Sequence, residues 1–118
     1  MKQPLKVKTY RAEIYCGLRP GYDDIKLPAD ITAAQSVCRD YCSEVKLCVT
    51  VTPTKFFYVG GEEPGFVVGA INYPRFPSKP EDIKLKMIEL AKRLKKQLSQ
   101  IRVSIVCDDE TIMLGDKE

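Results

Sequence analysis

The sequence changes character at Asn72-Tyr73-Pro74-Arg75-Phe76-Pro77-Ser78-Lys79-Pro80, where an apolar run ends and a long helical pattern begins. Three of these residues are proline, which fixes φ and lacks a backbone donor, so the segment is unsuited to a central strand or a helix interior. The sequence therefore predicts a stiff loop. The elements on its two sides determine the fold.

A strand and a helix are predicted near the start of the chain. Residues 9–19 alternate between apolar and polar side chains, which is typical of a strand with one buried face. Thr32 and Gln35 form a capping box, and apolar residues follow at spacings of three and four. This pattern predicts an amphipathic helix over about 32–45.

A hairpin is predicted between that helix and the proline loop. Residues 47–59 are rich in β-branched and aromatic side chains, which favours a strand, and Pro53 within it indicates a bulge or an edge position. The glycine-rich residues 60–65 suit a hairpin loop. Residues 66–72 then return as an apolar strand, with the character of a strand buried on both faces.

A second helix is predicted directly after the proline loop. Ser78 and Glu81 form another capping box, and Pro80 suits the first turn, where its missing donor costs nothing. Apolar residues then form one stripe as far as about Ser99.

The remaining residues predict two more strands. Residues 101–107 alternate, residues 108–110 make an acidic turn, and residues 111–114 pair back. The order is β-α-β-β-α-β-β. We therefore expect one α+β domain over 1–118, a two-layer sandwich of ferredoxin-like type with an antiparallel or mixed sheet and both helices on one face.

Composition places the chain among ordinary globular proteins. Its 118 residues carry a net charge of +3, and 79–102 hold eight basic against three acidic residues. No apolar run approaches the roughly 20 residues of a membrane span, and no secretion signal follows the basic start. The five cysteines are then expected to be free thiols in a reducing cytoplasm.

The residues argue against catalysis. The chain has no histidine, the commonest general base and metal ligand, and no phosphate-binding loop motif. Cys38 and Cys42 fall on an apolar helical stripe, and the acidic residues 108–110 fit a charged turn. We therefore expect no enzyme, no metal and no cofactor.

Binding chemistry is offered instead by two arginine-bearing turns, residues 17–22 and 72–77, and by Arg102 at the start of a predicted strand. Arginine binds phosphate through two N–H donors, aromatic rings stack on bases, and an asparagine amide forms hydrogen bonds with the polar edge of a base or ribose. The same residues also suit turns and core packing. The candidate ligand-binding residues are Arg19, Asn72, Arg75, Phe76 and Arg102, with Tyr22 and Tyr73 as second choices.

Two alternatives belong to other classes of protein. Residues 56–58, Phe-Phe-Tyr, could stack on single-stranded RNA beside basic side chains. The basic helix over 79–98 could instead dock on an acidic protein partner.

Four segments of the sequence resemble a family of small phage proteins. These are Ile14-Tyr15-Cys16-Gly17-Leu18-Arg19-x-Gly21-Tyr22, Leu47-Cys48-Val49-Thr50-Val51-Thr52-Pro53-Thr54, Ile71-Asn72-Tyr73-Pro74-Arg75-Phe76-Pro77 and Ser104-Ile105-Val106-Cys107. Together they look like the phage Thoeris anti-defence proteins of the first type, which act as sponges for nucleotide signals.

The resemblance implies a specific role. A protein of this family is a non-catalytic homo-oligomer in the host cytoplasm that sequesters cyclic ADP-ribose isomers made by bacterial TIR enzymes, so the downstream effector stays inactive. Some members are implied to hold cyclic oligonucleotides at a separate site, and neither DNA nor membrane is an expected partner. By the same resemblance Phe76 would stack on adenine, Asn72 would read a polar edge, and Arg19, Arg75 and Arg102 would contact phosphates.

Overall fold

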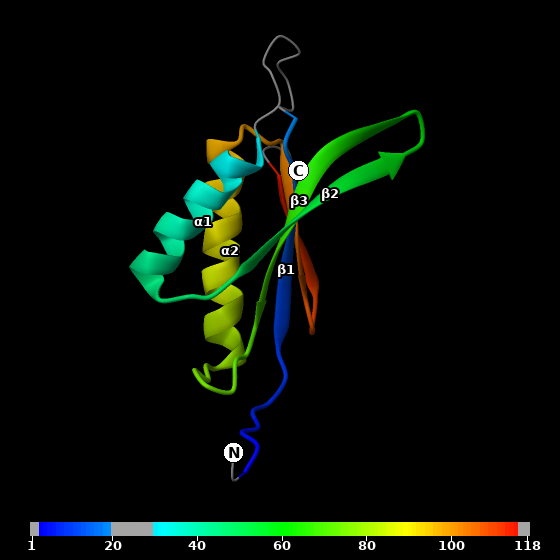
Figure 1. The fold of residues 1–118 in the computed structure, drawn as a ribbon. Helices are drawn as coiled ribbons and strands as arrows, with labels where there is room; N and C mark the ends of the chain where they lie inside the picture. The colour runs from blue at the N-terminus through cyan, green and yellow to red at the C-terminus, as the bar shows by residue number, and fades with distance from the viewer. Residues whose placement is uncertain (1–2, 20–29, 116–118) are drawn as a thin grey trace.

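The fold was analysed in a computed structural model, which describes residues 3–19 and 30–115 (Figure 1). The described elements follow the predicted order β-α-β-β-α-β-β. They are β1 (Arg11–Gly17), α1 (Ile31–Val45), β2 (Thr50–Tyr58), β3 (Gly61–Ile71), α2 (Pro80–Gln97), β4 (Arg102–Cys107) and β5 (Thr111–Gly115).

The strands form one antiparallel sheet in the order β2-β3-β1-β4-β5. The first four positions have the ferredoxin-like arrangement, and β5 adds a strand beyond β4, so the predicted fold class is confirmed. Pro53 lies opposite Phe66 on β2, which is an edge strand. An edge strand tolerates proline because it does not need every backbone donor for a second neighbour.

Both helices lie on the same side of the sheet (Figure 1). The buried core joins the inward side chains of β1, β3 and β4, such as Ile14, Phe66 and Ile105, to the apolar stripe of α2. The α1 helix is tied to α2, since Arg93 donates two hydrogen bonds to Glu44 and lies 4.7 Å from the centroid of the Tyr41 ring.

The helix starts differ from the predicted capping boxes. Asp30 is the N-cap of α1 and accepts from the backbone N–H of Ala33 at 3.2 Å, because the carboxylate precedes the helix where Thr32 is already inside it. Lys79 is the N-cap of α2 and makes no side-chain cap. Ser78 lies one residue before this cap, and its backbone N–H donates to the Asn72 side chain at 2.9 Å.

The opposite face of the sheet carries no described helix. Its side chains include the cross-strand row Thr52, Val67, Tyr15, Ser104 and Met113. The β2–β3 hairpin extends past the body of the molecule (Figure 1), and its end exposes Phe57, Tyr58 and Val59. Among the described helices, none is long and apolar enough to span a membrane.

Candidate functional site

The proline loop turns sharply after β3. The backbone N–H of Phe76 donates to the carbonyl of Tyr73 at 2.9 Å, which closes a tight turn with Pro74 in its second position. Proline favours this position because its fixed φ matches the turn. The predicted stiff loop is therefore present, and it presents Arg75 and Phe76 to solvent.

Asn72 holds the loop in place and is almost fully buried. Its side-chain nitrogen donates to the Lys8 carbonyl at 2.9 Å, and its side-chain oxygen accepts from the Ser78 N–H at 2.9 Å. Its backbone N–H also donates to the Tyr10 carbonyl at 3.0 Å. Because each polar end of the amide makes one hydrogen bond within the protein, Asn72 acts as a structural clamp in this conformation.

A cavity of about 370 Å³ lies beside this loop, and we call it the loop pocket. Its volume falls in the range of small-molecule sites. The lining residues come from the segment that follows α1, the end of β3, the proline loop and α2: Lys46, Leu47, Cys48, Ile71, Tyr73, Phe76, Ser78, Ile83 and Lys86.

The loop pocket combines aromatic faces with positive charge. The Arg75 guanidinium carbon lies 5.5 Å from the centroid of the Phe76 ring, and 68% of Phe76 is exposed. Tyr73 is half-buried, and its side-chain hydrogen bond with Cys48, together with burial, raises the pKa of the Tyr73 hydroxyl. This arrangement suits a planar ring with an anionic group.

The other predicted arginines lie at the far end of the sheet. Asn72 comes directly after Ile71, which pairs with Arg11 at the start of β1. Arg19 comes two residues after Gly17, at the other end of β1. Arg102 lies at that same far end, two residues from the Ser104–Tyr15 pair. Since the seven residues of β1 span about 20 Å, one small ligand cannot contact both groups. Tyr22 lies outside the described residues.

A second arrangement of polar groups, which we call the Glu63 corner, lies at this far end. It is centred on Gly17: a Cβ added there would lie 2.9 Å from Oε1 of Gln100 and 3.2 Å from Oε2 of Glu63. Gln100 is buried and donates to the carbonyls of Arg19 at 2.8 Å and Leu98 at 3.0 Å. A side chain at Gly17 would displace these groups, so glycine leaves the space they occupy.

Glu63 is half-buried and makes no hydrogen bond or ion pair with another described residue. It lies directly opposite Phe56 on β2, so an aromatic ring flanks the carboxylate. The nearby guanidinium of Arg19 is directed at the Glu62 carbonyl, with Nη1 at 3.4 Å from the oxygen. The corner thus offers one carboxylate for a cationic group.

The acidic turn is satisfied within the protein. Asp108 accepts from the Arg11 backbone N–H at 3.0 Å, and Asp109 accepts from the Tyr10 hydroxyl at 2.9 Å and from Lys84 at 3.0 Å. Glu110 also pairs with Lys84. No metal-ligating cluster occurs within residues 3–19 and 30–115.

Sequence reasoning did not identify Lys46, Lys86, Cys48 or Glu63 as site residues. Lys86 resembled the other lysines of a basic helix, and Cys48 resembled a strand residue. Glu63 stood in a glycine-rich turn with no distinguishing motif. Only their neighbours in the folded chain distinguish these residues.

Comparisons with known proteins support the fold. No protein-family model matches the chain, and no curated protein matches it in sequence. Two solved structures match nearly the whole chain. A phage SAM lyase in complex with S-methyl-5′-thioadenosine has a TM-score of 0.75 and 15% identity over 99% of this chain and 97% of that one. The apo state of a phage SAM lyase has a TM-score of 0.67 and 14% identity over 92% and 90% of the two chains.

These matches contradict the prediction that the chain is not an enzyme. Structures that share its fold almost end to end are lyases, so the small fold does not argue against catalysis. The predicted resemblance to phage proteins is supported at the level of the fold, and the chain is similar in fold to a phage SAM lyase.

Proposed function

We propose that the protein is a lyase that cleaves S-adenosylmethionine and releases S-methyl-5′-thioadenosine. The observation that carries this proposal is the agreement of the fold with a phage SAM lyase solved with that thioadenosine bound, over 99% of this chain and 97% of the other.

This reaction requires little acid–base chemistry from the protein. The substrate sulfur is already positively charged, so it leaves as a neutral thioether when it takes the electron pair of the carbon–sulfur bond. The substrate's own carboxylate attacks the γ-carbon and closes a five-membered lactone, so atoms and charge balance without water or a proton acceptor. The protein's task is to hold the carboxylate in line with the breaking bond. A chain without histidine is suited to this task.

Within the chain, Glu63 is our choice for the substrate's cationic end. It is a half-buried carboxylate with no described partner, and partial burial strengthens its attraction for a positive group. The ring of Phe56 flanks it and offers an apolar face to the ligand. In contrast, the loop pocket contains two lysines, which disfavour a ligand of net positive charge.

The test is to incubate the purified protein with S-adenosylmethionine and measure S-methyl-5′-thioadenosine by liquid chromatography and mass spectrometry. We expect product above a heat-inactivated control. Glu63→Gln should lower kcat/KM by about 10- to 100-fold, the effect of losing one charge-assisted contact. The matched control is Glu62→Gln, on the same strand and already paired with Lys55. No product from folded wild-type protein would overturn the proposal.

A second candidate function is binding of a cyclic ADP-ribose isomer in the loop pocket. The observation that favours it is the presence of Tyr73, Phe76 and two lysines around one cavity, which suits an adenine ring and phosphates. The protein is mixed with the signal, filtered, and heated to release what it holds. Recovery of no signal would contradict this candidate.

The resemblance adds two further proposals about partners. One is a homo-oligomer, which light scattering on the purified protein tests directly. The other is a separate site for cyclic oligonucleotides, which calorimetric titration tests, and an absence of heat above dilution would reject it.

A further inference from the structure

A second cavity shares Leu47 and Cys48 with the loop pocket. This cavity, about 360 Å³, is formed by one face of α1 and the chain that enters β2, with Gln35, Cys38, Arg39, Cys42, Leu47, Cys48, Val49 and Val51 around it. Leu47 and Cys48 line both cavities. We call the two together the Cys48 groove.

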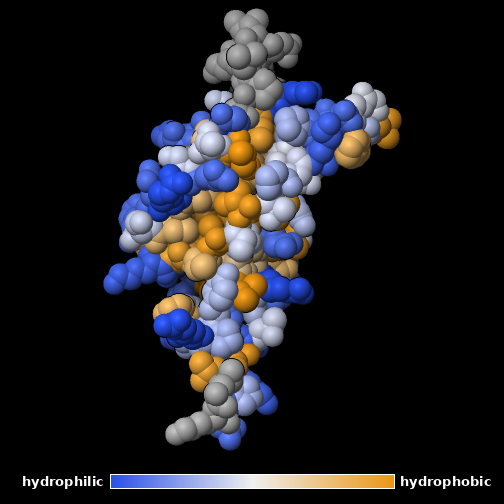
Figure 2. All heavy atoms as spheres, in the orientation of Figure 1, coloured by the Kyte–Doolittle hydropathy of each residue, from blue (hydrophilic) through white to orange (hydrophobic). Residues whose placement is uncertain are grey.

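The end of α1 creates this groove. Lys46 adopts the left-handed conformation with φ 59°, and the Leu47 N–H donates back to the Cys42 carbonyl at 3.1 Å. The chain therefore leaves α1 abruptly and crosses towards the sheet edge without covering the space between α1, α2 and the proline loop. Figure 2 shows apolar surface gathered between the helices and the sheet on this face, with polar residues around it.

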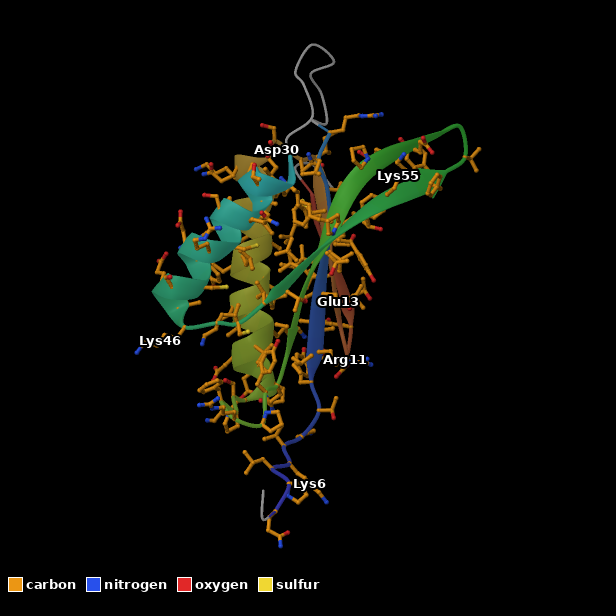
Figure 3. All side chains as sticks on the ribbon, in the orientation of Figure 1. Lys6, Arg11, Glu13, Asp30, Lys46 and Lys55 are labelled. Atoms are coloured by element: carbon orange, nitrogen blue, oxygen red, sulfur yellow. The ribbon has the colours of Figure 1, made fainter. Side chains whose placement is uncertain are left out.

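The groove carries positive charge and no described carboxylate. Lys46, Lys86 and Arg39 line it, and neither Asp nor Glu is among its described lining residues. Figure 3 shows Lys46 at the end of α1 with its side chain reaching away from the sheet, which places it at the rim.

Lys86 distinguishes the groove from an ordinary solvated surface. It is half-buried, and it forms no hydrogen bond or ion pair with another described residue. Lys84, two residues earlier on the same helix, is paired with both Asp109 and Glu110. A partly desolvated ammonium without a carboxylate favours an anion from solution.

We propose that the Cys48 groove binds a small anionic ligand with a planar ring, such as a nucleoside monophosphate, at a site separate from the Glu63 corner. The ring lies against Tyr73 and Phe76, and the anionic group contacts Lys86 and Lys46. This inference deepens the second candidate function, since it names the ligand class and the cationic contacts of that pocket. It does not depend on cyclic ADP-ribose being the ligand.

Cys48 provides a readout that is independent of activity. It is exposed and lines both cavities, whereas Cys16, Cys38 and Cys107 are buried. The experiment measures the rate at which N-ethylmaleimide alkylates Cys48, located by peptide mass spectrometry, with AMP, adenosine or inorganic phosphate present. We expect AMP to slow alkylation in a saturable way, with adenosine and phosphate each weaker than AMP.

Charge removal tests the proposed contacts. The double variant Lys46→Gln, Lys86→Gln should weaken protection by AMP about tenfold, the effect of losing two cations from one phosphate. The matched control Lys92→Gln, Lys96→Gln removes two exposed lysines of α2 outside the groove and should protect as wild type does. Absence of protection at millimolar AMP, or equal protection in both double variants, would overturn the proposal.

The proposals for the Glu63 corner and for the Cys48 groove can be refuted independently. Glu63→Gln should leave the protection of Cys48 unchanged, and the groove variant should retain lyase activity. If AMP protects Cys48 but neither thioadenosine release nor binding of cyclic ADP-ribose is found, both proposed functions fail and the groove inference stands.

Discussion

Replacing Asn72 by alanine should destabilise the fold, and the size of the effect follows from two hydrogen bonds. The amide donates to the Lys8 carbonyl and accepts from the Ser78 N–H, each at 2.9 Å. Both partners belong to exposed residues, so water can reach them after the substitution. Each bond then counts at about 1 kcal/mol, and the expected loss in the free energy of unfolding is about 2 kcal/mol.

Urea and thermal unfolding measure this loss. The entropy of unfolding for a chain of this length makes 1 kcal/mol equivalent to roughly 4 °C, so Asn72→Ala should lower Tm by about 8 °C. The matched control is Ser78→Ala, which keeps the backbone N–H that bonds to Asn72 and should change stability by less than about 0.5 kcal/mol.

If Asn72→Ala unfolds within about 0.5 kcal/mol of wild type, the amide does not hold the loop. If that variant also loses ligand binding, Asn72 is a ligand contact, as the sequence alone suggested, and the clamp interpretation is wrong.

Three further perturbations test other parts of the structure. Gly65→Ala should destabilise the sheet by more than about 2 kcal/mol in urea unfolding, because its Cβ would lie 2.7 Å from the Cys16 carbonyl oxygen; a neutral result would contradict this close approach. The hydrogen bond from Lys84 lowers the pKa of Asp109 in the folded protein. The ionised Asp109 carboxylate therefore stabilises the fold at pH values above its unfolded-state pKa, and this stabilisation is lost as the pH falls through its lower folded-state pKa. Unfolding curves between pH 7 and pH 2 should show that loss in wild type and a smaller one in Asp109→Asn, and equal losses would show that the carboxylate does not contribute. Burial raises the pKa of Cys16 to about 12, so native protein at pH 8 should be alkylated at exposed Cys48 long before Cys16. Equal alkylation rates at the two thiols would contradict the burial of Cys16.

The prediction about catalysis failed for a chemical reason. Absence of histidine removes the commonest general acid and base, but carboxylate, lysine, tyrosine and cysteine side chains can also transfer protons. The substrate of the proposed function carries a sulfonium and a carboxylate, so it would bring its own leaving group and its own nucleophile. The residue inventory of a chain therefore limits its reactions only when the substrate is specified.

Local pattern was sufficient for the type and order of the elements, although β3 begins at Gly61, within residues 60–65 that were predicted as a hairpin loop. The alternation in 9–19 and 101–107, the three-and-four spacing after Thr32 and Ser78, and the prolines of 72–80 are effects of neighbouring residues on one backbone. They predicted the order of the elements and the stiff loop. The predicted caps differ from the observed ones, because Thr32 lies two residues after the Asp30 cap of α1 and Ser78 lies one residue before the Lys79 cap of α2.

The sequence by itself determined which elements form, their order and the overall excess of positive charge, because these depend on residues close together in the chain. Only the tertiary structure decided which side chains meet. The antiparallel course of β1 and β3 separates Arg19 from the proline loop, and it brings Glu63 and Gln100 together over Gly17. The chain that leaves α1 after its left-handed residue lets Cys48 line the same cavity as Lys86. These spatial arrangements depend on strand register and on helix packing between residues far apart in the sequence, and local periodicity does not encode them.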